Sequence, residues 1–265
     1  MADSHWAAHA GQWERLGAPL RPPPPVLEAV GAELAGHDDS VLLLGVTGEY
    51  AGLGRRLLAF DIDAGLLTRV WPGDQPDRRA RIGDWRTLST LADGERFTAA
   101  TGDGSLNCVT YADQASVWRE LAVVLEPGAV VAVRAFVTPD DPGTPESVRA
   151  DAYAGRAGGF HGFKWRLTMA LVREHGTPDI AVADILDAFD ALFPDRDELA
   201  AAAGWSTEAV GTIDVYRGSP VVYSFPTAAE LRAQVPSAFA GVRFVASGDY
   251  DLAERCPILV ADRTG

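Results

Sequence analysis

The most informative part of this sequence is Val41-Leu-Leu-Leu-Gly45-Val-Thr47-Gly48-Glu49, which the run Leu57-Leu-Ala-Phe-Asp61-Ile-Asp63 follows. A short apolar run breaks into small residues, a helical segment intervenes, and a second apolar run stops at a carboxylate. Adjacent parallel strands with this pattern commonly hold a nucleotide-type cofactor. The glycines let backbone N–H groups approach the ligand, and the acid accepts hydrogen bonds from ribose hydroxyls.

The glycine loop lacks the marks of two common phosphate sites. It contains neither a complete G-x-G-x-x-G nor the G-K-[ST] that cradles a triphosphate. Thr47 also places a side chain where a pyrophosphate would need room. A cofactor without a pyrophosphate therefore fits this loop better than a dinucleotide.

Composition narrows the class of partner. The chain has 265 residues, a net charge of −14 and 47% hydrophobic residues, which indicates one folded, acidic α/β domain. Nucleic acid and anionic membranes are disfavoured as partners, because phosphate contacts require clustered Lys and Arg. The start Met1-Ala-Asp-Ser-His-Trp6 has no basic region or apolar core of a signal peptide, and no apolar run reaches about 18 residues. We expect a cytoplasmic protein, with Cys108 and Cys256 as reduced thiols, although the sequence does not exclude a disulfide.

The order of elements predicts an α/β core with helical additions. Apolar runs predict strands at 41–45, 57–61, 80–82, 97–103 and 129–136, and helical segments lie between them. This alternation is typical of βαβ units in a parallel sheet. Helical patterns precede the sheet over 4–17 and from 26, and fill much of 145–217; strand-like runs return at 221–225, 242–246 and 257–261. We predict an N-terminal helical lid (1–37), a core (38–137 and 221–265) and a helical cap inserted after the fifth strand (138–220).

Four strand ends in this order resemble the class I S-adenosylmethionine-dependent methyltransferases. The matching segments are Leu44-Gly45-Val-Thr47-Gly48-Glu49, Phe60-Asp61, Ile82-Gly83-Asp84-Trp85 and Gly102-Asp103-Gly104-Ser105-Leu106-Asn107. The resemblance is close over residues 41–136 and looser for the terminal strands. It implies a Rossmann-like, seven-stranded, mostly parallel sheet with flanking helices, and S-adenosyl-L-methionine as the cofactor.

The resemblance also implies roles for individual cofactor-binding residues. The loop Gly45, Val46, Thr47 and Gly48 would back the methionine and ribose, Asp61 with Ile62 would hold the ribose, Asp84 and Trp85 would meet the adenine, and Asp103, Gly104 and Ser105 would line the methionine side. Arg21, in a proline-rich hinge, could pair with the methionine carboxylate. Simpler roles remain open: a helix N-cap for Asp61, core packing for Trp85 and a solvated side chain for Arg21.

The acceptor side carries weaker signals. His161, within Gly158-Gly159-Phe160-His161-Gly162, starts the helix that should overhang the methyl group, and we name it the candidate general base. Lys164 and Arg166 are candidates for binding an acidic substrate group. The alternatives are a structural histidine and two solvated charges. Trp6 and Trp13 would line the substrate mouth or pack in the core, and Tyr153 and Tyr216 could hydrogen-bond a substrate.

These patterns lead to one main hypothesis and three rivals. The main hypothesis is methyl transfer to the O or N atom of a small metabolite or natural product, by a monomer or homodimer. The rivals are non-methylating S-adenosylmethionine chemistry (cyclisation, elimination or rearrangement), a non-catalytic cofactor- or partner-binding protein, and a nicotinamide-dependent dehydrogenase. No metal site is expected, because His5 and His9 lack a third ligand nearby and no C-x-x-C or H-E-x-x-H occurs.

Overall fold

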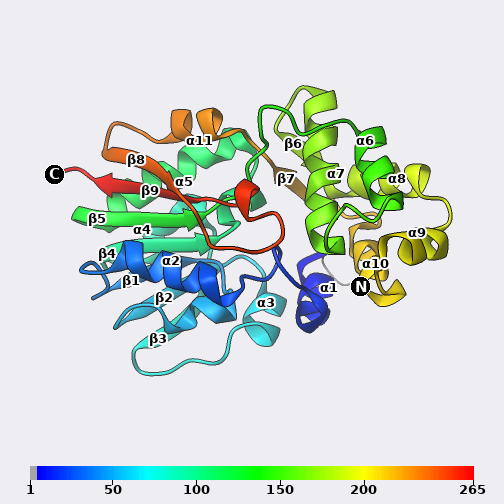
Figure 1. Cartoon of the computed structure of the whole chain (residues 1–265). Coiled ribbons are helices and arrows are strands. Elements are labelled where there is room, and N and C mark those ends of the chain that lie inside the picture. The colour runs from blue at the N-terminus through cyan, green and yellow to red at the C-terminus, as the bar shows by residue number, and fades with distance from the viewer. Residues whose placement is uncertain (1–4) are drawn as a thin grey trace.

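The computed structural model of the chain describes residues 5–265, and its centre is a seven-stranded sheet (Figure 1). The strands follow the order β3-β2-β1-β4-β5-β9-β8. Their bounds are β1 Val41–Leu44, β2 Leu57–Asp61, β3 Arg78–Ile82, β4 Phe97–Asp103, β5 Leu125–Arg134, β8 Phe239–Val245 and β9 Ile258–Arg263. Strand β9 is antiparallel to both of its neighbours, whereas the pairs from β3 to β5 are parallel. The predicted Rossmann-like, seven-stranded, mostly parallel sheet is confirmed.

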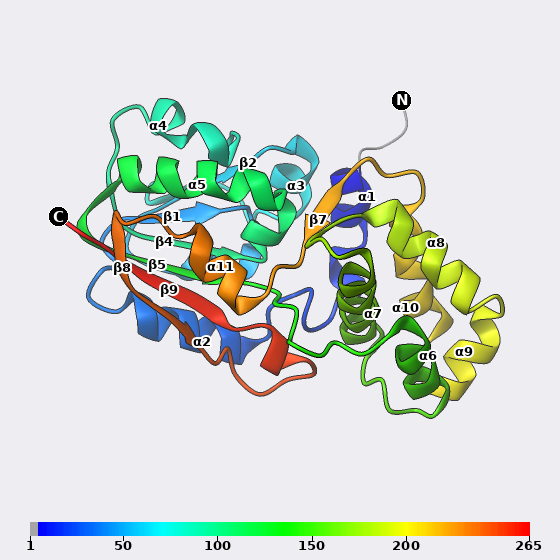
Figure 2. The ribbon, with the colours of Figure 1, turned by 90° about the horizontal axis from the view of Figure 1, so that it is seen from above.

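The central strands of the sheet, such as β1 and β2, are buried because they are apolar on both faces. In β1, Leu42 and Leu44 pack into the cluster that holds Trp118 of α5, whereas Val41 and Leu43 pack with the α2 side. Figure 2 shows α2 on one face of the sheet and α4, α5 and α11 on the other. The core helices are α2 Pro24–Leu34, α3 Ala64–Arg69, α4 Leu88–Leu91, α5 Tyr111–Val124 and α11 Ala228–Gln234. Short 3-10 segments are η2 Gly48–Gly52, η3 Trp85–Thr87, η4 Ser105–Cys108 and η6 Ala253–Arg255.

A second, mostly helical unit stands beyond the carboxyl ends of the parallel strands (Figure 1). It comprises α6 Pro145–Tyr153, α7 Phe160–His175, β6 Asp179–Ala181, α8 Val182–Leu192, α9 Arg196–Ala203, α10 Thr207–Gly211, η5 Thr212–Tyr216 and β7 Val222–Ser224. Helix α7 is its centre, and most of its residues are buried. The strand predicted at 221–225 exists as β7. It pairs antiparallel with β6 and not with the large sheet, so the secondary structure of this unit extends past the predicted boundary at 220.

The N-terminal helix lies between the sheet and the helical unit in both views (Figures 1 and 2). The single helix predicted over 4–17 is α1 His5–Gly11 followed by the 3-10 segment η1 Trp13–Arg15, and residue 4 lies outside the described residues. Arg69 Nη1 donates to the Ala7 carbonyl at 3.1 Å, and Gln12 Nε2 donates to the Thr212 carbonyl at 3.0 Å. Hydrogen bonds therefore join α1 and η1 to both units. Within residues 5–265, no helix is long and apolar enough to cross a membrane.

Asn107 fixes the position at which strand β7 meets the core. Its Nδ2 donates to the carbonyls of Phe136 at 2.8 Å and Ser224 at 2.7 Å, and its Oδ1 accepts the Phe136 N–H at 2.9 Å. One buried amide thus satisfies three backbone groups just past β5 and at the end of β7. This pairing brings β7 against the carboxyl edge of the sheet.

Gly36 precedes β1 and Gly54 precedes β2, and both have a positive φ. Gly36 has φ +84° and open space where a Cβ atom would stand, whereas a Cβ atom at Gly54 (φ +76°) would overlap Cγ2 of Val41 and lie 3.0 Å from the Asp38 carbonyl. Gly36→Ala should lower the free energy of unfolding by about 1–2 kcal/mol through backbone strain alone. Gly54→Ala should cost about 1–3 kcal/mol more, because it also overpacks the core. Urea unfolding of both variants measures the difference, and equal losses would contradict the packing described.

Candidate functional site

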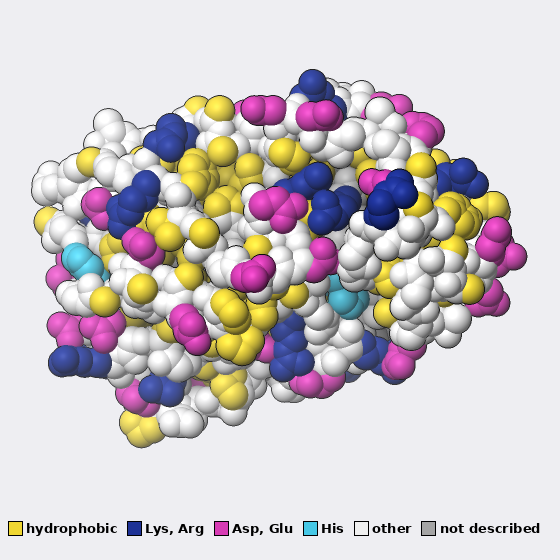
Figure 3. Space-filling model, in the orientation of Figure 1, with side chains coloured by type: hydrophobic (Ala, Val, Ile, Leu, Met, Phe, Trp, Pro, Cys, Tyr) yellow, Lys and Arg dark blue, Asp and Glu magenta, His cyan; other side chains and the backbone are white. Residues whose placement is uncertain are grey.

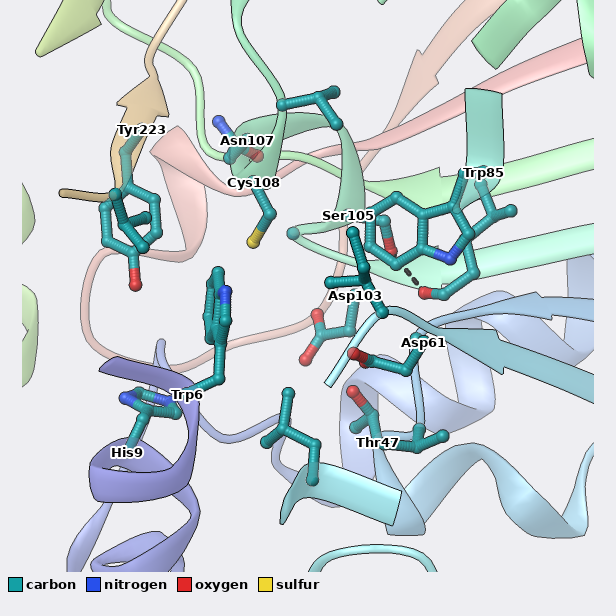
Figure 4. A pocket seen from close by; sticks show the side chains of 18 of the residues that line it. Trp6, His9, Thr47, Asp61, Trp85, Asp103, Ser105, Asn107, Cys108 and Tyr223 are labelled. Carbon is teal, nitrogen blue, oxygen red and sulfur yellow. Dashed lines mark hydrogen bonds between the residues drawn. The ribbon is translucent and has the colours of Figure 1, made fainter. Parts of the chain in front are cut away.

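A cavity of about 510 Å³ lies where the strand ends, α1 and the helical unit meet (Figure 4). Its floor is the carboxyl edge of β1, β2 and β4, where ligands of α/β sheets usually bind. Of the predicted cofactor-binding residues, those that line it are Gly45, Val46, Thr47, Asp61, Ile62, Asp84, Trp85, Asp103, Gly104 and Ser105. The structure therefore brings four separate segments of the sequence together around one space.

Asp61 is a buried carboxylate at the end of β2 and points into this cavity (Figure 4). Its Oδ1 accepts the Asp63 N–H at 3.0 Å. The N-cap of α3 is Asp63, whose side chain accepts from the N–H groups of Gly65 and Leu66. Asp61 is therefore not the cap that the sequence left open as its alternative role. Burial raises the pKa of Asp61 to about 6, as expected for a carboxylate with few hydrogen-bond donors.

Gly45 and Trp85 are fixed by the same carbonyl group. The Phe60 carbonyl accepts from Gly45 N at 2.8 Å and from Trp85 Nε1 at 2.6 Å. Gly45 has φ +106°, and a Cβ atom there would be 3.8 Å from the Trp85 ring and 3.9 Å from Asp61 Oδ2. The loop thus lets the indole and the carboxylate approach one another. The Trp85 ring lines the cavity on its strand-end side (Figure 4).

Asp84 is engaged by its neighbour Arg86. Asp84 Oδ1 accepts the Arg86 N–H at 2.9 Å, and the Arg86 guanidinium donates to both carboxylate oxygens. These hydrogen bonds hold the pKa of Asp84 below its usual range. Arg86 also donates to Asp113 at 2.8 Å. An adenine amino group would have to share Asp84 with Arg86, and a carboxylate has enough lone pairs for both.

Asp103 forms an ion pair with Arg134, and both side chains are almost fully buried. Burial raises the pKa of Asp103, and the Arg134 guanidinium opposes that rise. Arg134 also donates to the Pro19 carbonyl at 2.6 Å and to the Tyr250 hydroxyl at 3.1 Å. The pair therefore connects the ends of β4 and β5 to the N-terminal segment.

The turn after Asp103 depends on close packing. Ser105 Oγ donates to the Leu44 carbonyl at 2.5 Å, which joins this turn to the end of β1. Gly104 has φ +64°, and a Cβ atom there would lie 2.6 Å from the Phe136 ring. Only glycine fits this position without displacing that ring.

Arg21 and Gly48, two of the predicted cofactor residues, do not line the cavity. Arg21 forms ion pairs with Glu49 at 2.5 Å and Glu14 at 2.9 Å, so its guanidinium ties the N-terminal segment to η2. A Cβ atom at Gly48 would lie 2.8 Å from the Val70 carbonyl, so this glycine serves backbone packing. The positions of Arg21 and Gly48 therefore do not support the cofactor contacts predicted for them.

The three residues predicted for the acceptor side also lie outside the cavity lining. His161 Nε2 lies 3.1 Å from the Arg15 carbonyl and holds the segment after α1, and burial lowers its pKa to about 4. Lys164 is fully buried in the helical unit. Arg166 faces Asp251 at 3.6 Å and Glu254 at 3.8 Å. These positions fit structural contacts and give the predicted catalytic and substrate-binding roles no geometric support.

Sequence reasoning missed most of the wall opposite the strand ends. This wall includes Trp6, His9, Trp13, Trp165 and Tyr223, and next to it the cavity is lined by Phe136, just past β5, and by Cys108 of η4. Trp6, His9 and Trp13 are spaced i, i+3 and i+7, which is the signal of one helix face. Trp6 and Trp13 line the cavity and Trp6 also packs against the hydrophobic core, whereas Tyr153 and Tyr216 do not line the cavity.

Among the described residues, the site contains neither a metal-binding cluster nor a reactive thiol. No group of three or more His, Cys, Asp or Glu side chains in residues 5–265 could hold a metal ion. Cys108 and Cys256 are both free. Burial raises the pKa of the Cys108 thiol to about 12, so the thiol is neutral at neutral pH and a poor nucleophile.

Comparison with solved structures places this arrangement in a known fold. The CcbJ methyltransferase from Streptomyces caelestis superposes with a TM-score of 0.56 at 14% identity, over 99% of each chain. A chain from the complex of the Haloferax volcanii Trm112 methyltransferase activator with a putative methyltransferase gives 0.54 at 13% identity, over 98% of this chain and 95% of that one. This chain has the class I methyltransferase fold.

Other comparisons add limits. A Rhodobacter sphaeroides protein described as a putative Zn-dependent alcohol dehydrogenase gives a TM-score of 0.55 at 12% identity, over the whole of both chains. No protein-family model matches the sequence. No curated protein matches it either. At these identities the likeness shows the fold alone, so the function has to be argued from the site.

The raised pKa of Asp61 predicts a stability cost that depends on pH. The folded protein holds the Asp61 proton more tightly than the unfolded chain does, so stability is lost as pH rises from the ordinary value of 3.8 through about 6. Asp61→Asn should therefore raise the free energy of unfolding of the ligand-free protein by about 1–3 kcal/mol at pH 7.5, and the gain should vanish near pH 3.5. Denaturant unfolding at both pH values measures this, and a gain independent of pH would contradict the burial argument.

Proposed function

We propose that this protein is an S-adenosylmethionine-dependent methyltransferase that acts on a small molecule. The observation that carries the proposal is Asp61, a buried carboxylate that faces the cavity beside Gly45 and Trp85 with too few donors of its own. A vicinal ribose diol would supply two O–H donors to this group. The class I methyltransferase fold supports the same assignment, because its strand-end edge is where this carboxylate lies.

The residues present fit the cofactor part by part. The Asp61 carboxylate would accept the ribose hydroxyls, the Trp85 ring would cover the adenine, and the Asp84 carboxylate would accept its amino group. Backbone groups of Gly45, Val46 and Thr47 and the carboxylate of Asp103 would face the methionine part. When bound, the cofactor supplies a methyl group already activated on a sulfonium. The tasks of this chain are then to hold it, to orient the acceptor in line and to exclude water.

Several features support a small acceptor over a nucleic acid. The cavity is walled by α1 and the helical unit, and its opposite wall is mostly aromatic. The net charge is −14. On the face shown in Figure 3, acidic and basic side chains are interspersed, with no broad basic surface. A phosphate backbone would find few partners there.

A related reaction class would use the same cofactor residues. Cyclisation, elimination or rearrangement with S-adenosylmethionine needs the same glycine loop and the same Asp61. The products separate these reactions: methyl transfer yields S-adenosylhomocysteine, whereas the others yield 5′-methylthioadenosine or unchanged cofactor. Mass spectrometry of reaction mixtures with candidate acceptors therefore decides between them.

Cofactor binding tests the proposal first. Isothermal titration should show that S-adenosylhomocysteine binds the purified protein and that NAD does not, because Thr47 stands where a pyrophosphate would need room. Denatured protein should release bound S-adenosylmethionine or S-adenosylhomocysteine on mass spectrometry when the site is loaded. Binding of NAD without binding of either sulfur cofactor would refute the proposal.

Substitution of Asp61 tests the residue that carries it. Asp61→Ala should weaken S-adenosylhomocysteine binding by about 10- to 150-fold, which corresponds to roughly 1.5–3 kcal/mol for charge-assisted hydrogen bonds. Asp63→Asn is the matched control two residues away, because asparagine also caps helices well and should leave the affinity unchanged. Equal affinities of Asp61→Ala and the wild type would remove Asp61 from the ribose site.

A further inference from the structure

The wall of the cavity opposite the strand ends is aromatic and uncharged. Trp6, Trp13 and Trp165 line it. The carboxylates that line the cavity, such as Asp61 and Asp103, stand on the strand-end side. Figure 4 shows Trp6 rising from α1 between Tyr223 and Asp103. Whatever binds against this wall meets flat apolar rings, which suits an aromatic ring.

Three ionisable side chains stand on this wall or next to it, and all are neutral at neutral pH. Burial raises the pKa of Cys108 to about 12 and that of Tyr223 well above its ordinary value. The Tyr223 hydroxyl is already paired with His5 Nε2 at 3.0 Å. For His9, burial first and then the nearby basic groups lower the pKa to about 3. The wall therefore offers no charge to pair with an ionic acceptor.

His9 is the hydrogen-bond acceptor of this wall that lacks a hydrogen-bond partner among the described residues; Trp165 Nε1 also lacks one, but an indole N–H can only donate. Its Nδ1 is buried without a hydrogen bond, and Nε2 makes no hydrogen bond to another described residue. The ring is held by edge contacts with Trp6 and Trp13, each with centroids 6.2 Å away. A neutral imidazole in this position offers a hydrogen-bond acceptor to a ligand.

Behind the wall lies one buried lysine, Lys164, whose ammonium form disfavours cations. Lys164 is fully buried, 3.5 Å from Thr212 Oγ1, and its ammonium lies 5.5 Å from the ring centres of Phe160 and Tyr216. It makes no ion pair among the described residues. Burial lowers its pKa to about 7, and its charge adds to the lowering at His5 and His9. An ammonium group packed against this wall would meet this repulsion, since the carboxylates of the cavity lie on the strand-end side.

We propose that the acceptor is an uncharged aromatic compound with a hydroxyl group, whose ring packs against Trp6 and whose O–H donates to His9 Nε2. This rests on the proposed function, since it names the acceptor of that same site. His9 would be the acceptor-binding residue that orients the hydroxyl oxygen toward the methyl group. Overall, the oxygen gains the methyl group, the bond from methyl carbon to sulfur breaks with its electron pair left on sulfur, and the hydroxyl proton goes to water.

The test uses four probes with the same ring and different substituents. They are 2-naphthol, naphthalene, 2-naphthoate and naphthalen-2-ylmethylammonium, titrated into the protein saturated with S-adenosylhomocysteine. 2-Naphthol should bind tightest, about 2- to 12-fold tighter than naphthalene, which is the worth of one net hydrogen bond. The two charged probes should bind more weakly than naphthalene, because they lose hydration and find no counter-charge on the aromatic wall.

Substitutions then test whether His9 causes the preference for 2-naphthol over naphthalene. His9→Leu should abolish the difference between 2-naphthol and naphthalene, and His9→Gln, which keeps an acceptor, should retain part of it. His175→Leu, at an exposed position at the end of α7, should change nothing. The affinity for S-adenosylhomocysteine should be the same in every variant, which also shows that each has folded.

Three outcomes would overturn the inference while leaving the proposed function intact. They are absence of binding by all four probes, tighter binding of a charged probe, and a 2-naphthol preference that survives His9→Leu. Absence of S-adenosylhomocysteine binding by the wild type is a separate result, and it would refute the proposed function instead.

Discussion

The buried ion pair between Arg134 and Asp103 connects the parts of the molecule that form the cavity. Arg134 ends β5 and Asp103 ends β4, and the same guanidinium binds the Pro19 carbonyl and the Tyr250 hydroxyl. Removing either partner would leave an uncompensated buried charge, which commonly costs about 3–5 kcal/mol. The pair therefore holds the N-terminal segment at the carboxyl ends of β4 and β5, and α1 of that segment lines the site.

The second constraint is the shared edge of the parallel strands. Strands β1, β2 and β4 end side by side, so segments distant in sequence deliver Gly45, Asp61 and Asp103 to one space. Burial of Asp61 there raises its pKa and costs stability in the absence of a ligand. A functional group held at such a cost is typical of binding sites, where a ligand provides the missing partners.

The sequence predicted the sheet and its strand-end residues well because both are local signals. Runs such as Val41–Leu44 are apolar without interruption, and each ends in the residues that line the cavity. The sequence pattern does not tell a cavity-facing acid from a capping one, because Asp61 and Asp63 both stand between the end of a strand and the start of a helix; in the structure Asp61 lines the cavity and Asp63 caps α3. Likewise β7 reads as a strand from its sequence, but its partner β6 is distant in the chain and only tertiary packing selects it.

The acceptor side was harder to predict for a physical reason. Helix α7 is buried on nearly all sides, so its hydrophobic pattern does not tell which face meets the cavity, and His161 holds the Arg15 carbonyl instead. The helical spacing of Trp6, His9 and Trp13 did indicate that these side chains share one helix face. What that face meets depends on tertiary contacts, such as that of Arg134 at the end of β5 with the Pro19 carbonyl, which the local sequence does not reveal.

The most direct measurement is a crystal structure of the protein with S-adenosylhomocysteine. The account predicts both ribose hydroxyls within about 3 Å of the Asp61 carboxylate oxygens, with the adenine against Trp85 and the sulfur directed toward Trp6 and His9. A ligand bound elsewhere, or a ribose that leaves Asp61 without a contact, would contradict it.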